Sequence, residues 1–210
     1  MRTFLSSKWT KRVVFFLCLV PFLLLVLQSV TGNLGINPVE TLQHTTGDWT
    51  LRFLILTLCI TPMRKIFHLP ELIRFRRMLG LNAFFYVCLH FLTYLGPDQS
   101  FGLGGMFEDV AKRAYITVGF AALVLLVPLA LTSTAGWVRR LGGKRWSQLH
   151  RLIYVVAVLG VIHYDWSVKS NKIKPFTYGT ILLVLLVWRI GASWKRQSKK
   201  AKGEAPLARA

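Results

Sequence analysis

Long apolar stretches, separated by shorter polar segments, run through the whole chain. Six of them can be distinguished, at residues 13–30, 49–66, 79–95, 116–132, 149–166 and 176–194. An α-helix needs about 20 residues to cross the roughly 30 Å of hydrocarbon in a bilayer, and each stretch is close to that length. The pattern therefore predicts an all-α integral membrane bundle of six transmembrane helices, whose connecting segments are too short to hold a soluble domain.

Composition agrees with this prediction. Of the 210 residues, 53% are hydrophobic, and the mean hydropathy is +0.47, as expected for a chain immersed in lipid. The first stretch follows basic residues, as in a signal peptide, but it is long and no small-x-small cleavage site follows it, so we interpret it as a retained helix. Residues 1–194 are thus predicted to form the membrane domain. Residues 195–210 are predicted to be a basic, low-complexity, disordered tail beside anionic membrane lipid.

The distribution of basic residues predicts the orientation. A formal net charge of +19 would suggest a nucleic-acid partner for a soluble protein. Here, however, Lys and Arg gather at alternate connections: four precede the first helix, five lie around the second connection, four around the fourth, and six follow the last helix. The other connections hold none, two and three. By the positive-inside rule, both termini are cytoplasmic, and no nucleic acid is expected as a partner.

Three histidines lie inside the predicted helices, where ionisable side chains are costly and usually functional. His90 lies in the second half of the third helix and His163 near the far end of the fifth. At about 1.5 Å per residue, both reach roughly 17 to 20 Å from the cytoplasmic side. Two imidazoles at one depth can ligate the two faces of a six-coordinate haem iron. Alternatively, each histidine hydrogen-bonds a neighbouring carbonyl within the bundle.

His150 stands at the cytoplasmic mouth of the fifth helix and could ligate a second haem. At 100° per residue it is rotated by about 140° from His163, so two haems would lie on different sides of the helix unless Gly160 permits a bend. On the third helix, a partner for His150 is expected about fourteen residues before His90, and this position holds Arg76. A guanidinium is a poor ligand because it stays protonated. Arg76 could instead pair with a haem propionate, leave His150 as the sole axial ligand, coordinate weakly, or serve only as a topology arginine.

Several stretches, in a fixed order from Gly35 to Lys169, match a known family. They are GINPVETLQHTTGDW, TPMRK, RRMLGLNAFFYVCLH, KRAYITVG, TSTAGWVRRLGGKRWSQLHR and HYDWSVK. In these stretches the chain resembles the MsrQ family, the haem-binding membrane subunits of bacterial periplasmic methionine-sulfoxide reductase systems, within the ferric-reductase-like transmembrane superfamily. Two positions depart from the expected pattern. Ala114 stands where the family usually has proline, and Arg76 stands where ferric reductases and NADPH oxidases carry a fourth histidine.

The resemblance implies one or two b-type haems held by His90 and His163, with His150 as a further ligand, and an association with FMN that we place on no residue. It implies a multi-pass electron-transfer subunit in the bacterial inner membrane, supplied by the quinone pool or by a cytoplasmic flavin reductase. Its implied partner is a periplasmic molybdopterin methionine-sulfoxide reductase catalytic subunit, in a heterodimer that repairs oxidised periplasmic proteins. Two other functions stay open: a stand-alone ferric or oxygen reductase, and a cofactor-free transporter that uses the histidines as a relay.

The residues also suggest a direction of electron flow. Beyond residue 194 we find no strand pattern and no GxGxxG motif, so we expect the electron donor to be a separate molecule. Electrons would then pass from near His150 to the His90 and His163 pair, and outward to the partner.

Some charged and polar residues outside the helices are candidates for minor roles. The lysines at 169, 172 and 174 either steer an acidic face of the partner or extend along the membrane interface. The NP and GD contexts favour cap and turn roles for Glu40 and Asp48 over a role as proton acceptors. His44 and His68 are predicted to be solvated.

Overall fold

The computed structural model describes residues 5–99 and 101–204, and all regular structure in this part of the chain is helical. Each predicted apolar stretch coincides with a helix. These helices are α2 (Lys8–Val30), α3 (Pro38–Ile66), α4 (Ile73–Thr93), α6 (Ala114–Leu131), α8 (Leu152–Ser167) and α9 (Ile173–Glu204). Four shorter elements were not predicted: the 3-10 helix η1 (Pro70–Leu72), the π-helix η2 (Tyr94–Asp98), α5 (Leu103–Lys112) and α7 (Ala135–Leu149).

Four helices in the described residues are long and apolar enough to cross a membrane: α2, α4, α6 and α9. The apolar helix α8 is shorter, with 16 residues. α3 is long, but it carries polar residues at positions that face the inside of the bundle, where Thr46, Asp48, Thr50 and Thr57 are all buried. The low hydropathy of α3 therefore results from its central place, where protein rather than lipid surrounds it.

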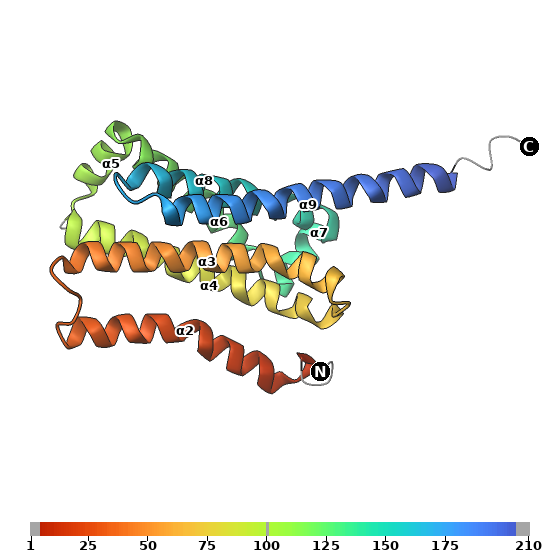
Figure 1. Ribbon diagram of the computed structural model, residues 1–210, viewed down its shortest axis with the longest axis horizontal. Helices are drawn as coiled ribbons and strands as arrows, with labels where there is room; N and C mark the ends of the chain where they lie inside the picture. The colour runs from red at the N-terminus through yellow and green to blue at the C-terminus, as the bar shows by residue number, and fades with distance from the viewer. Residues whose placement is uncertain (1–4, 100, 205–210) are drawn as a thin grey trace, which may run out of the picture.

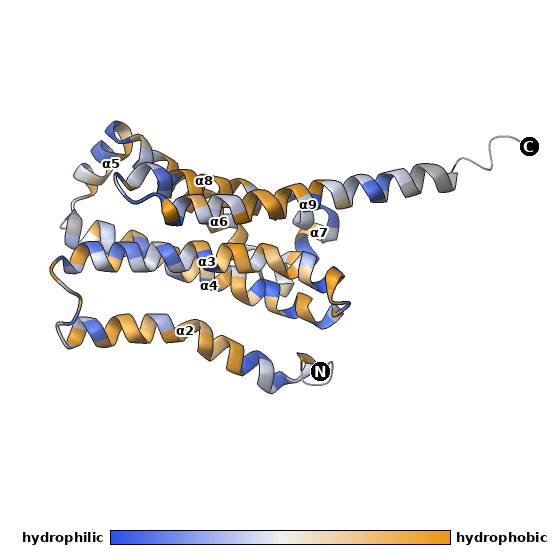
Figure 2. Cartoon of the chain, in the orientation of Figure 1, coloured by the Kyte–Doolittle hydropathy of each residue, from blue (hydrophilic) through white to orange (hydrophobic). Residues whose placement is uncertain are grey.

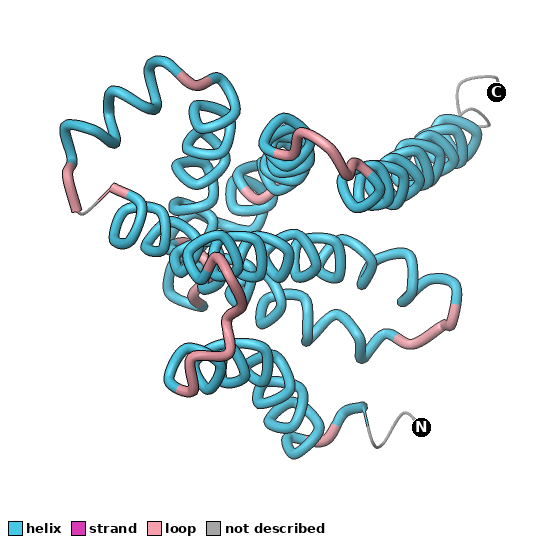
Figure 3. The backbone as a smooth tube through the Cα atoms, turned by 60° about the vertical axis from the view of Figure 1, so that its left-hand side comes forward, coloured by secondary structure: helices cyan, strands magenta, loops and turns pink. Residues whose placement is uncertain are grey.

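The helices form an elongated bundle. α3 and α4 lie side by side along their length, α6 pairs with α8, and α9 covers α8 and α3 (Figure 1). The view in Figure 3 shows α2 standing apart at one side of this group. Apolar residues cover most of the middle of the bundle, whereas hydrophilic residues gather toward its ends (Figure 2).

The start of α2, the end of α9 and all of α7 lie toward the same end of the bundle, and α5 lies at the opposite end (Figure 1). α9 continues to Glu204, so the helix does not end at the predicted boundary after residue 194; residues 205–210 lie outside the described part of the chain. This arrangement brings together the basic connections that the charge distribution assigns to one side.

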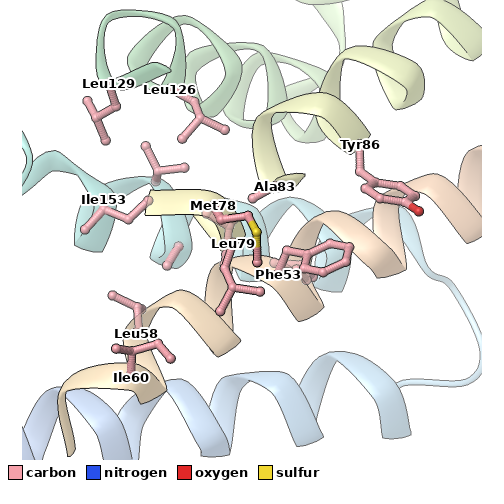
Figure 4. Packing of buried hydrophobic residues seen from close by; sticks show 14 of the residues in the cluster. Phe53, Leu58, Ile60, Met78, Leu79, Ala83, Tyr86, Leu126, Leu129 and Ile153 are labelled. Atoms are coloured by element: carbon pink, nitrogen blue, oxygen red, sulfur yellow. The ribbon is translucent and has the colours of Figure 1, made fainter. Parts of the chain in front are cut away.

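The core of the bundle depends on close packing, because lipid is as apolar as the side chains themselves. Small residues let the helices approach: Ala83 on α4 is fully buried, and Ala157 on α8 is 1% exposed. Figure 4 shows the larger side chains around Ala83, namely Phe53, Leu58 and Ile60 from α3, Met78, Leu79 and Tyr86 from α4, Leu126 and Leu129 from α6, and Ile153 from α8.

A tyrosine from α4 completes the hydrogen bonding of α2 near a proline. α2 contains Pro21 and bends along its length (Figure 1). The Tyr86 hydroxyl donates to the carbonyl oxygen of Cys18 at 2.9 Å and accepts from the amide of Phe22 at 3.0 Å. These two groups are an i and i+4 pair, which would bond to each other in a regular helix. The phenol is thus inserted into the α2 hydrogen-bond ladder and ties this outer helix to α4.

Candidate functional site

Two of the predicted residues face each other across an internal cavity. His90 projects from α4 and His163 from α8, with ring centroids 6.0 Å apart and ring planes at 78°. Both line a cavity of about 270 Å³ whose walls come mainly from α3, α4, α6 and α8. His90 and His163, which were predicted to lie at one depth, therefore do lie beside each other at one cavity.

The hydrogen bonds of the two rings define which nitrogen is free. His90 Nδ1 lies 3.0 Å from the carbonyl oxygen of Gln43 in α3, and His163 Nδ1 lies 2.7 Å from the carbonyl oxygen of Tyr115 in α6. A carbonyl oxygen can only accept, so Nδ1 carries the proton in both neutral rings. The lone pair is then on Nε2, the nitrogen through which a ring oriented in this way binds a metal. Hydrogen bonding to carbonyls and metal ligation are therefore compatible at this site.

Two glycines allow the imidazoles to lie close to the neighbouring helices. A Cβ atom on Gly47 of α3 would lie 3.3 Å from His90 Cε1, and one on Gly119 of α6 would lie 2.6 Å from His163 Nδ1. Real Cβ atoms do not approach a ring as closely as the second distance requires. Gly119 is thus needed for the observed His163 orientation, and Gly47 leaves His90 little spare room.

The spacing of the rings fits one metal ion between them. A metal–nitrogen bond is about 2 Å long and a ring nitrogen lies about 1 Å from the ring centre, so two imidazoles on one iron have centroids about 6 Å apart. The observed separation of 6.0 Å agrees with this value. Together with two Nε2 lone pairs, this spacing is compatible with two imidazoles that would hold one iron of a haem.

His150 lies in a second cavity of about 280 Å³, which is also lined by Arg76. Its Nε2 is 3.1 Å from Thr132 Oγ1, and this hydroxyl donates to the carbonyl of Pro128 at 2.6 Å. Thr132 must then accept from His150, which puts the proton on Nε2 and the lone pair on Nδ1. Trp146 stacks on the ring with centroids 4.0 Å apart. His150 is therefore held in the opposite tautomer to the other two histidines.

The position of His150 corrects one premise of the sequence analysis. α7 ends at Leu149 and α8 begins at Leu152, so His150 belongs to the link between two helices rather than to the helix that carries His163. The rotation of about 140° assumed a single continuous helix and does not apply. His150 and Arg76, in contrast, share a cavity, as the spacing from His90 led us to expect.

The other two histidines are exposed. His44 lies 3.6 Å from the Glu40 carboxylate near the mouth of the first cavity, and His68 lies in the turn after α3. The amide of Glu40 donates to Asn37 Oδ1 at 3.3 Å, so the NP context does mark a helix start. Both histidines are exposed, as predicted, but the prediction that His44 lies outside the helices is wrong, because His44 lies within α3.

Asp48 is the site residue that the sequence analysis misjudged. It does not lie in a turn: it lies within α3, its side chain is 8% exposed, and it lines the first cavity. Its carboxylate accepts from Lys174 Nζ at 2.8 Å. Its spacing of four residues from Arg52 was the available signal for a helical position.

Two of the three far-side lysines are engaged within the chain. Lys174 pairs with Asp48, and Lys172 lies 3.0 Å from the Asp165 carboxylate. Each of these two lysines therefore has a carboxylate partner within the chain, which leaves Lys169 as the better candidate of the three for steering a partner.

The structure is a helical bundle with membrane-capable helices and two facing histidines at one cavity. A family model described as "ferric reductase like transmembrane component" matches residues 46–161. Curated relatives extend the similarity over most of the chain. Protein-methionine-sulfoxide reductase haem-binding subunit MsrQ from Herminiimonas arsenicoxydans is 53% identical over 90% of this chain and 88% of its own length.

Two further relatives carry the same description. The protein from Rhodospirillum rubrum is 50% identical over 92% of this chain and 91% of its own length, and the protein from Ralstonia nicotianae is 48% identical over 96% and 95%. At this level of identity and coverage, the chain belongs to the MsrQ family.

Proposed function

We propose that this chain binds b-type haem between His90 and His163 and carries electrons through the bacterial inner membrane to a methionine-sulfoxide reductase. The main support is the pair of Nδ1–carbonyl hydrogen bonds, which leaves both Nε2 lone pairs available beside one cavity. The printed names of the relatives, which describe haem-binding subunits of protein-methionine-sulfoxide reductase, support this assignment.

When bound, haem supplies an iron that accepts and releases one electron at a time. The chain's own residues then have three tasks. His90 and His163 provide neutral nitrogen ligands, the carbonyls of Gln43 and Tyr115 fix the orientation of the rings, and apolar cavity walls such as Leu54 exclude water. Rigid, dry surroundings of this kind favour electron transfer over side reactions.

The proposed topology has six membrane-spanning helices with both termini in the cytoplasm. Support comes from the basic connections and from the common end of the bundle at which α2 begins and α9 finishes (Figure 1). His150 and Arg76 lie nearer this end, and His90 and His163 nearer the other. Electrons therefore enter on the His150 side and leave on the His90 and His163 side.

The donor is membrane quinol or a cytoplasmic flavin reductase, and the acceptor is a periplasmic molybdopterin-dependent catalytic subunit that reduces methionine sulfoxide. The family's FMN has no identified residues in this chain. The visible absorption spectrum of the detergent-purified protein, oxidised and then reduced with dithionite, tests the haem assignment. A Soret band that shifts on reduction is expected, and a spectrum without one would exclude this function.

A second haem at the cavity shared by His150 and Arg76 would have one imidazole ligand, because His150 is the one histidine among the described residues that line it. We expect His150→Ala to remove a minor component of the reduced spectrum and to leave the main component in place. Difference spectra of the parent and the variant, scaled to protein concentration, measure this. Loss of the main component in His150→Ala would show that His150 acts at the first site instead.

Gly119→Ala should reduce the haem content several-fold. The new Cβ would lie 2.6 Å from His163 Nδ1, so the ring must turn and lose its bond to the carbonyl of Tyr115. Gly191→Ala is a matched control, since Gly191 also lies in a long helix and has no neighbour within 4 Å. The haem-to-protein ratio after purification distinguishes the two variants. Equal ratios would mean that the His163 orientation does not determine haem binding.

A further inference from the structure

A buried carboxylate lies beside the proposed haem site and takes no part in holding the imidazoles. Asp48 lines the same cavity as His90 and His163, and its side chain is 8% exposed. It follows Gly47, against which the His90 ring packs, and Tyr164, the residue after His163, lines the same cavity. Asp48 therefore shares one cavity with both candidate ligands.

The two oxygens of this carboxylate have different surroundings. Oδ2 accepts from Lys174 Nζ at 2.8 Å and lies 3.9 Å from Arg52 Nη2. Oδ1 is buried without a hydrogen-bond partner. A buried carboxylate oxygen in this state is unfavourable unless positive charge nearby compensates for it.

The paired cations compensate only in part. The side chain of Lys174 is 62% exposed and that of Arg52 is 41% exposed, whereas that of Asp48 is 8% exposed and borders the cavity. Asp48 itself therefore contributes a negative field at the cavity, and Lys174 and Arg52 contribute fields of the opposite sign.

A negative field at this cavity favours the more positive state of whatever lies between the histidines. With two neutral imidazoles and a porphyrin dianion, ferric haem has one net positive charge and ferrous haem has none. We propose that Asp48 stabilises the ferric state of the haem held by His90 and His163 and so lowers its reduction potential, while Lys174 limits this effect. This inference rests on the proposed function. In it, Asp48 acts on the haem through its charge and does not ligate the iron.

Redox titration of the purified protein, followed by visible absorption at one fixed pH, tests the inference. Asp48→Asn should raise the ferrous-to-ferric ratio at a given potential by about tenfold. For a one-electron couple, this corresponds to a rise in the reduction potential of about 59 mV. Asp48→Glu retains the charge and should restore most of the parent potential. Lys174→Gln should change the potential in the opposite direction, by a smaller amount because Lys174 is exposed.

Asp165→Asn is the matched control. Asp165 is paired with Lys172 at the same end of the bundle, but its side chain is 34% exposed and it is not among the residues that line the cavity. At a given potential, the ferrous-to-ferric ratio of Asp165→Asn should stay within twofold of the parent ratio. An equal shift in both variants would overturn the inference, because it would report surface charge alone.

The remaining outcomes are also decisive. A normal haem spectrum in Asp48→Asn with an unchanged potential overturns the inference and leaves the proposed function intact. If Asp48→Asn retains too little haem to titrate, a Lys174→Gln potential that is not lowered overturns it instead. Absence of haem from the parent protein would contradict the proposed function itself.

Discussion

His163→Ala should leave the purified protein with less than about a tenth of the parent's main haem absorbance, and His90→Ala should do the same. Each variant removes one of the two proposed ligands, and the proposed b-type haem would have no covalent bond to the protein that could retain it. The pyridine haemochrome content per protein measures the loss. Equal haem content in either variant and the parent would refute the proposed pairing.

His44→Ala is the control for these variants. His44 also borders the cavity, but it is exposed and pairs with Glu40, so its removal should leave the haem content unchanged. A loss as large as that in His163→Ala would mean that haem retention depends on the mouth of the cavity rather than on the facing rings.

A second substitution separates ligation from simple hydrogen bonding. The amide of His163→Gln can still donate to the carbonyl of Tyr115, but it is a poor ligand for haem iron. If the histidine served only as a hydrogen-bond donor within the bundle, this variant would behave like the parent. If it ligates iron, His163→Gln should lose haem as His163→Ala does, while the protein still purifies as a folded monomer or complex.

The sequence was sufficient for the parts of the structure that depend on local composition and helix geometry. Each apolar stretch became a helix because its length and hydropathy are properties of consecutive residues. The pairing of His90 with His163 followed from depth alone, since a fixed rise per residue places side chains along the membrane normal. His150 and Arg76 came to one cavity for the same reason.

What the sequence could not predict depends on contacts between helices. Asp48 resembles a turn residue in the GD context, and only its pairing with Lys174, more than a hundred residues away, shows why α3 can bury it. The roles of Gly47 and Gly119 likewise require knowledge of which ring lies opposite each glycine. The break before α8 was not predicted because the predicted apolar stretch starts at residue 149, whereas α8 starts at Leu152.

The attachment of α2 is a further contact of this kind, and it leads to a large expected effect on stability. Tyr86→Phe should lower the free energy of unfolding by about 2 to 4 kcal/mol, because it leaves the Phe22 amide and the Cys18 carbonyl without their shared partner in a region with little water. Tyr86 is 1% exposed, so water does not readily replace the hydroxyl. Denaturant titration of the detergent-solubilised protein measures the change, and proteolytic cleavage at the start of α2 reports the local opening of this helix.

Tyr178→Phe is the control for the loss of a phenolic hydroxyl, because the Tyr178 oxygen accepts from the exposed side chain of Arg52 and bridges no backbone groups. A double-mutant cycle with Pro21→Ala tests the mechanism more sharply. Without proline, α2 can straighten and bond the Phe22 amide directly to the Cys18 carbonyl, so Tyr86→Phe should cost less in the Pro21→Ala background than in the parent. Equal costs in both backgrounds would show that Tyr86 stabilises α2 by packing alone, and not by completing its interrupted hydrogen-bond ladder.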